Sequence, residues 1–398
     1  MKKKLLALAL ALTMALSLAA CGGDSSNADS TGETSTEENS GASGTAFKVG
    51  VIGPMTGGAA IYGTCVANSA QIAVDEINAL GGDIQFELMV EDDVNDAETS
   101  LNAYNALMDD GMQILVGTVT TTPALNVVPQ AYEDRVFTIT PSASGDDVIE
   151  NNDNVFQICF TDSNQGSRSA QYINEHFPDA KIAIIYKNDD QYSIGIRDNF
   201  KAEADARGMS VVYEGTFTEA SQTDFNVQLA AAQSAGADLL FLPISYTPAS
   251  VILTQANAMG YAPTFFGVDG MDGILTMPGF DASLAEGVML LTPFSVNSED
   301  AATQSFVKTY TEKYGVEPNQ FAADAYDAIY TLYQAIQAAG VTADMSNEEI
   351  CDALIEVMPT LAVTGLTSAG SEMTWDSNGA VSKDPTAVVI ENGTYVTP

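Results

Sequence analysis

Short apolar runs alternate along the chain with longer segments whose apolar residues recur every three or four positions. The run at 47–52, for example, precedes the segment 64–80, where Ala70, Ala73 and Val74 share one helix face. Such pairs predict alternating β-strands and helices, typical of a parallel sheet covered by helices on both faces. Up to residue 139 the pattern predicts strands at 47–52, 84–90, 112–116 and 136–139 and helices at 64–80, 97–109 and 124–132.

The same alternation starts again after residue 161, which indicates a second α/β unit. It predicts helices at 163–176, 193–207, 225–235 and 248–259 and strands at 181–186, 210–213, 238–242, 264–267 and 287–292. Helices at 300–314, 319–339 and 347–358 follow, and the C-terminal part has a β-like pattern at 373–375 and 387–390. The residues from position 46 onward are enough for two lobes.

The N-terminal segment does not follow this pattern. Residues 1–20 combine three lysines with an apolar run too short for an ordinary membrane span, which predicts an export signal peptide. Leu18–Cys21 resembles the bacterial lipobox, and this implies cleavage before Cys21 and lipidation of that residue. The alternative is an ordinary signal peptide with an incidental cysteine. Residues 22–45 are rich in Ser, Gly and Thr, so Cys21 and these residues predict a lipidated, flexible tether.

Charge limits the possible partners. The chain carries 14 Lys and Arg against 53 Asp and Glu, a formal net charge of −39. This balance argues against nucleic-acid binding. The acidic residues are spread along the chain, which favours a role in solubility over a role in one site.

Few side chains are available for metal binding or nucleophilic catalysis. Besides Cys21 the chain has Cys65, Cys159 and Cys351; the first and last of these could pair, and Cys159 is expected to be buried. His176 is the single histidine, which removes most metal sites and His-based catalysis. There is also no P-loop and no Gly-x-Ser-x-Gly motif. We therefore predict a protein that is not an enzyme and uses no cofactor or metal.

The stretch 137–145 has the composition of a binding loop. Ser142 and Ser144 follow a predicted strand and precede a helix that begins at Asp146. In an open α/β sheet, ligands bind at this end of the strands, and a helix N-terminus favours negative charge. We predict that this loop holds the carboxylate of a small amphipathic ligand.

A series of stretches, in this order and spacing, resembles the leucine/isoleucine/valine-binding type of extracytoplasmic solute-binding proteins of ABC transporters. They lie at 49–57, 62–63, 73–78, 81–82, 92–93, 116–117, 138–142, 155–160, 165–166, 192–193, 224–225, 267–270 and 325–328. The resemblance implies the type I periplasmic-binding-protein fold: two doubly wound parallel-sheet lobes, joined by three crossovers, that close by hinge motion around a ligand.

The resemblance also implies where the chain passes between the lobes. We expect crossovers near 160–162, 292–294 and 373–376. Lobe 1 would then contain 46–161 and 294–373, and lobe 2 would contain 162–293 and 374–398.

In the family, two loops supply hydroxyls and backbone N–H groups to the ligand's α-carboxylate. Carried over, these are Thr121, with Thr120 as the alternative, and Ser142 and Ser144. Asp269 matches the acid that pairs with the ligand's ammonium, although the best-characterised relatives have a longer acid there.

Aromatic residues at four matching positions would form the walls of the cleft. Tyr192 and Tyr246 match positions in lobe 2, and Tyr62 and Phe321 match positions in lobe 1. Each could instead be ordinary packing, and Phe321 could be part of a helix core.

The resemblance thus implies a lipid-anchored extracytoplasmic receptor that binds an amino acid and delivers it to ABC permease subunits. A branched-chain amino acid is the default ligand, while other relatives take aromatic amino acids, amides or urea. We expect a monomer whose membrane contact is the lipid anchor alone. The alternative is an amino-acid or amide sensor of the same fold that acts in signalling.

Overall fold

The structure is a computed structural model that describes residues 45–368 and 370–397. The predicted signal peptide, Cys21 and nearly all of the predicted tether lie outside the described residues. None of the described helices is long and apolar enough to cross a membrane.

Five parallel strands form the first sheet, in the order β2-β1-β3-β4-β5. Their bounds are Phe47–Gly53 (β1), Phe86–Asp92 (β2), Ile114–Leu115 (β3), Phe137–Thr140 (β4) and Val155–Gln157 (β5). Strand β5 was not predicted, because a three-residue buried strand leaves no alternation to recognise.

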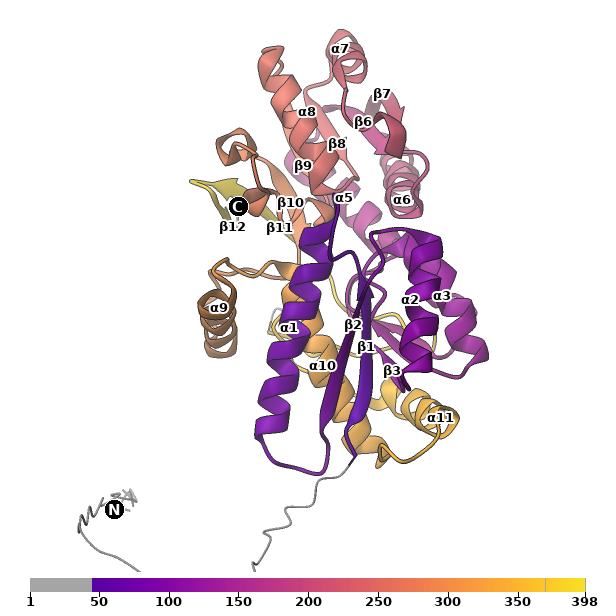
Figure 1. Ribbon diagram of the computed structural model, residues 1–398. Helices are drawn as coiled ribbons and strands as arrows, with labels where there is room; N and C mark the ends of the chain where they lie inside the picture. Colours follow the sequence, from indigo (N-terminus) through magenta and orange to yellow (C-terminus); the bar gives the residue numbers. More distant parts are fainter. Residues whose placement is uncertain (1–44, 369, 398) are drawn as a thin grey trace, which may run out of the picture. The chain divides into compact units, whose positions relative to one another are not determined.

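Helices cover both faces of this sheet (Figure 1). On one face lie α1 (Ala60–Ala79), α10 (Gln320–Ala339) and α11 (Asn347–Val357). On the other lie α2 (Ala97–Asp109) and α3 (Thr121–Glu133), and the short α4 (Asp146–Ile149) leads into β5. In sequence, α10 and α11 come after the parallel strands of the second sheet, although they cover the first sheet.

The second sheet has seven strands, in the order β12-β11-β10-β9-β8-β6-β7. Their bounds are Lys181–Lys187 (β6), Ser210–Phe217 (β7), Leu239–Leu242 (β8), Thr264–Gly267 (β9), Met289–Thr292 (β10), Thr386–Glu391 (β11) and Thr394–Val396 (β12). Strands β6 to β10 are parallel, and β11 and β12 extend the sheet with antiparallel pairing. The parallel part repeats the strand order of the first sheet.

Alternate residues of β6 show how this sheet is covered. Ile182 and Ile184 pack in the cluster that contains α5 (Asp162–His176) and α6 (Gln191–Arg207). Ala183 and Ile185 pack in the cluster that contains α7 (Asn226–Ser234) and α8 (Tyr246–Ala258). Helix α9 (Ala301–Tyr314) adds side chains to the second of these clusters. The α/β class with two doubly wound sheets is therefore confirmed.

The predicted β-structure at 373–375 differs from what is observed. Met373 and Trp375 form only isolated bridges, to Val363 and Val381. The segment instead follows the edge of the first sheet, where Trp375 Nε1 donates to the Gln157 carbonyl at 2.8 Å. Strand β12 was not predicted.

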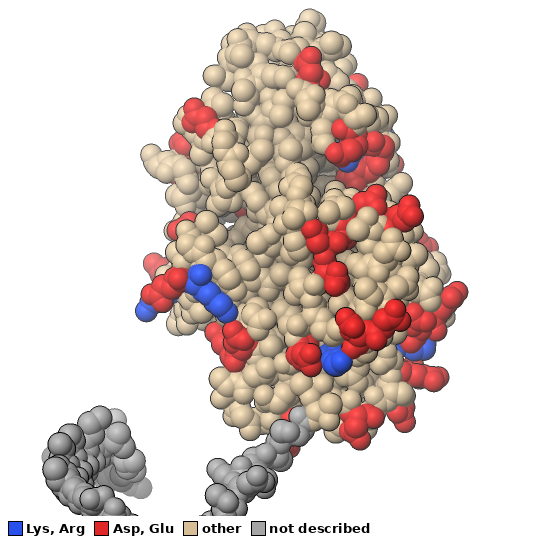
Figure 2. Space-filling model, in the orientation of Figure 1, with Lys and Arg blue, Asp and Glu red and all other residues tan. Residues whose placement is uncertain are grey.

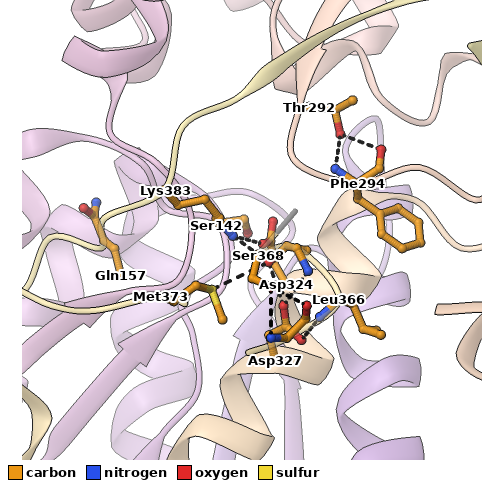
Figure 3. A network of polar contacts seen from close by, with 12 residues as sticks. Ser142, Gln157, Thr292, Phe294, Asp324, Asp327, Leu366, Ser368, Met373 and Lys383 are labelled. Atoms are coloured by element: carbon orange, nitrogen blue, oxygen red, sulfur yellow. Dashed lines mark hydrogen bonds and ion pairs between the residues drawn. The ribbon is translucent and has the colours of Figure 1, made fainter. Parts of the chain in front are cut away.

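A buried polar network holds the connection into β11 (Figure 3). Lys383 Nζ donates to Asp324 Oδ1 and to Thr367 Oγ1, each at 2.7 Å. Thr367 in turn donates to Asp327 Oδ2 at 2.6 Å. The last residues before β11 are thus fixed to helix α10, which covers the first sheet.

The three cysteines of the described chain are buried and free. Cys65 and Cys351 therefore do not pair, and the prediction that Cys159 is buried is confirmed. Figure 2 shows acidic side chains in several separate groups on one face, with few basic ones among them.

Candidate functional site

A cavity of about 490 Å³ lies at the carboxyl ends of the parallel strands of both sheets. Its lining residues come from the loops and helix starts that follow β1, β2, β3 and β4 and β6, β7, β8 and β9, with Phe321 added from α10. This volume lies in the range of small-molecule sites, and the carboxyl edge is where open α/β sheets bind ligands. Six of the eight predicted ligand residues line it: Tyr62, Thr121, Ser142, Tyr192, Asp269 and Phe321.

The wall from the first sheet is rich in hydrogen-bond donors. Thr121 and Thr122 are the first residues of α3, and the first N–H groups of a helix have no acceptor within the helix. The N-cap Thr120 donates its hydroxyl to Asn95, so the helix end stays open toward the cavity. Ser142 also lines the cavity from the loop after β4, but its hydroxyl donates to the Val119 carbonyl at 2.6 Å, so the open donors of this wall are those of α3. This wall suits an anionic group, because the helix dipole also favours negative charge there.

Ser144 lies beside the cavity rather than on its wall. Its side chain is fully buried and donates to Asp162 Oδ1 at 2.7 Å, while its carbonyl accepts the Asp162 N–H at 2.8 Å. Burial raises the pKa of Asp162 well above its usual range, and the Ser144 hydrogen bond opposes this rise. Ser144 thus fastens the loop after β4 to the start of α5, and contact with a ligand stays a prediction for this residue.

The wall from the second sheet presents a buried carboxylate. Asp269 follows β9 and is 1% exposed. Its Oδ1 accepts the Tyr192 hydroxyl at 2.5 Å, and its N–H donates to Gln165 Oε1 at 2.7 Å. Burial raises the pKa of Asp269 to about 6, against the hydrogen bond from Tyr192. At neutral pH this side chain is therefore mostly ionised and can accept a hydrogen bond from a cation.

More charged groups line this second wall than the sequence indicated. Lys187 Nζ pairs with Glu219 Oε2 at 2.7 Å, and Asp189 and Asp190 also line the cavity. Burial raises the pKa of Asp190, which accepts the Thr122 hydroxyl at 3.1 Å. Asp190 lies in the loop after the predicted strand at 181–186, and an acid in a strand-end loop was a signal that could have found it.

Three of the four predicted aromatic residues form an edge-to-face cluster beside the cavity. The Tyr62 ring lies 4.8 Å from the Phe321 ring and 4.9 Å from the Tyr246 ring. Tyr62 and Phe321 line the cavity. Tyr246 does not line it; its ring packs against Tyr62, and its hydroxyl accepts the Ile61 N–H at 3.2 Å. Tyr62 thus joins Phe321 and Tyr246, while Tyr192 lines the cavity beside Asp269.

Direct hydrogen bonds join the loops of the two sheets around the cavity. Tyr62 donates to the Gly270 carbonyl, and the Thr247 hydroxyl donates to the Gly58 carbonyl at 2.6 Å. The Thr122–Asp190 hydrogen bond adds a third link. The cavity is therefore lined by backbone and hydroxyl donors from the first sheet and by carboxylates from the second, an arrangement that fits a small zwitterion.

Comparisons with known proteins agree with this fold and site. Residues 46–390 match the family model described as periplasmic binding protein. The Leu/Ile/Val-binding protein of Rhizobium johnstonii is 28% identical over 300 residues, which cover 74% of this chain and 80% of the relative.

Two solved structures extend this similarity. A leucine-binding protein of Thermotoga maritima has a TM-score of 0.78 and 27% identity, over 88% of this chain and 97% of its own. A branched-chain amino acid transporter substrate-binding protein of Streptococcus pneumoniae, in complex with isoleucine, has a TM-score of 0.78 and 28% identity, over 89% and 100%.

Proposed function

The chain belongs to the periplasmic-binding-protein family, and we propose that it is an extracytoplasmic receptor that binds an α-amino acid between its two sheets. The default ligand is a branched-chain aliphatic amino acid, the class named for the relatives described above. The receptor would deliver this ligand to the permease of an ABC transporter. Its partners would be the ligand and the permease subunits.

The observation that carries this proposal is the opposition of two chemically different walls. The ligand's carboxylate would lie at the N-terminus of α3, close to Thr121 and Ser142. Its ammonium would donate to Asp269, and Tyr62 and Phe321 would contact its apolar part. A charge-assisted hydrogen bond in a closed cavity contributes about 1.5–3 kcal/mol.

We also propose the attachment and the lobe boundaries. Lipidation at Cys21 would anchor the receptor to the bacterial cell membrane, with residues 22–45 as a tether. Lobe 1 would contain 46–161 and the residues from 294 to the third crossover. Lobe 2 would contain 162–293 and the residues after that crossover. The contact of Trp375 with β5 supports a third crossover at 383–386, later than the one expected at 373–376.

Asp269→Asn tests the proposed ammonium partner. Loss of the negative charge should weaken amino-acid binding at least tenfold, which corresponds to about 1.4 kcal/mol. Calorimetric titration with L-isoleucine measures the change. Asp205→Asn, at an exposed residue of α6, is the matched control and should bind as the unmodified protein does. Equal affinity in the two variants would place the ammonium partner elsewhere.

A further inference from the structure

The N-terminal ends of α1 and α8 meet beside the candidate ligand site, and each is capped by a tyrosine of the other helix. Ile61, in the first turn of α1, donates its N–H to the Tyr246 hydroxyl at 3.2 Å. Tyr246 is the first residue of α8 and donates its own N–H to the Tyr62 hydroxyl at 3.4 Å. The first N–H groups of a helix have no acceptor within that helix, so each tyrosine supplies an acceptor that the other helix lacks.

Ring packing and further hydrogen bonds strengthen this junction of α1 and α8. The rings of Tyr62 and Tyr246 meet edge to face with centroids 4.9 Å apart, and both side chains are buried. The Tyr62 hydroxyl donates to the Gly270 carbonyl, and the Thr247 hydroxyl donates to the Gly58 carbonyl at 2.6 Å. Each of these links joins a segment that follows β1 of the first sheet to a segment that follows β8 or β9 of the second.

Tyr246 differs from the other side chains of the junction in its position relative to the cavity. Tyr62 and Thr247 line the cavity, as do Gly58 and Gly270, whereas Tyr246 does not. The Tyr246 hydroxyl can therefore affect a bound ligand only through the arrangement of the two walls.

The arrangement of the walls matters because the proposed ligand is held from both sides. Its carboxylate would lie at the start of α3 and its ammonium at Asp269, which belong to different sheets. Separation of the walls would break these ligand contacts and the junction of α1 and α8 together. A hydrogen bond that exists only while the walls are together increases the population of the binding-competent arrangement, and it raises affinity by that factor.

We propose that Tyr246 is a positioning residue whose hydroxyl holds the two walls of the ligand site together and slows release of the ligand. This role rests on the proposed function, and it differs from the direct ligand contact that the sequence predicted for Tyr246.

Tyr246→Phe tests this role, because it removes the hydroxyl and keeps the ring that packs against Tyr62. Calorimetric titration of the full chain with L-isoleucine should show binding about three- to tenfold weaker than that of the unmodified protein, the effect of one lost hydrogen bond. Tritiated L-isoleucine, chased with unlabelled isoleucine, measures the dissociation rate. This rate should rise by a similar factor, while the association rate changes little.

Tyr261→Phe is the matched control. Tyr261 is also buried, and its hydroxyl donates to the Ala237 carbonyl at 2.8 Å. Both residues lie in connections between elements of the second sheet, so this variant loses a buried tyrosine hydrogen bond without changing the junction of the walls. It should keep the isoleucine affinity and dissociation rate of the unmodified protein, which separates the proposed role from a general loss of stability.

Equal isoleucine affinities and dissociation rates in Tyr246→Phe and Tyr261→Phe would overturn the role of Tyr246 and leave the proposed function intact. No isoleucine binding by the unmodified protein would instead contradict the proposed function, and the role of Tyr246 with it. The two failures are therefore distinguishable in one set of titrations.

Discussion

At the scale of single residues, the ionisation of Asp269 decides what the cavity can hold. The carboxyl group is buried beside the Tyr192 hydroxyl, and burial raises its pKa to about 6. Its charged form is therefore present at neutral pH but is lost within a short pH range below it. A ligand ammonium would stabilise the charged form and compete with the proton.

This competition predicts a pH dependence of binding. Amino-acid affinity should fall about tenfold from pH 7 to pH 5, because protonation of Asp269 in the empty cavity removes the ammonium's partner as the pH falls through about 6. Burial also raises the pKa of Asp190. Protonation of this second carboxyl group as the pH falls would also weaken the binding of an ammonium.

Calorimetric titrations with L-isoleucine at a series of pH values measure this profile. The profile of Asp269→Asn should be flatter, whatever affinity that variant retains. An affinity of the unmodified protein that does not change over this range would contradict the assigned role of Asp269.

At the scale of elements, two consecutive residues of the connection into β11 form ion pairs with helices of different sheets. Lys383 pairs with Asp324 of α10, and the two side chains are 3% and 1% exposed. Asp384 pairs with Arg168 of α5, where the side chains are 58% and 43% exposed. The first pair fastens the connection to a helix of the first sheet, and the second pair fastens it to a helix of the second sheet. Residues 383 and 384 thus connect the helices of the two sheets.

The two ion pairs should differ in their effect on stability. Lys383→Met leaves a buried carboxylate without its cation and should lower the free energy of unfolding by about 3–5 kcal/mol. Arg168→Ala breaks an exposed pair and should cost at most about 1 kcal/mol. Urea unfolding of both variants measures the difference.

A double variant separates the unpaired charge from lost packing. Adding Asp324→Leu to Lys383→Met removes the buried charge and should recover most of the lost stability. Equal, small losses for Lys383→Met and Arg168→Ala would show that the buried pair does not anchor the connection.

At the scale of the whole molecule, much of the fold could be predicted from the sequence. The periodicity gave nearly all helices and the longer strands, because amphipathic helices and apolar strands leave repeating patterns. Strands β5 and β12, of three residues each, leave no such pattern. The return of α10 and α11 to the first sheet was not visible from local patterns either, since it depends on contacts distant in sequence.

The candidate site could be predicted only in part, for similar reasons. Strand-end positions identified Ser142 and Ser144, and resemblance identified Thr121 and Asp269. The orientation of a side chain depends on its neighbours, so the sequence could not show that Ser144 points to Asp162 instead of the cavity.

The central claim is that two opposed walls hold the two charged ends of one amino acid. The most direct test is a calorimetric comparison of three ligands on the full chain: L-isoleucine, 3-methylpentanoate, which lacks the ammonium, and 2-methylbutylamine, which lacks the carboxylate. We predict saturable binding of isoleucine and at least tenfold weaker binding of each analogue in the cavity, or about 1.4 kcal/mol per lost charge. No binding of isoleucine, or equal binding of either analogue, would contradict the account.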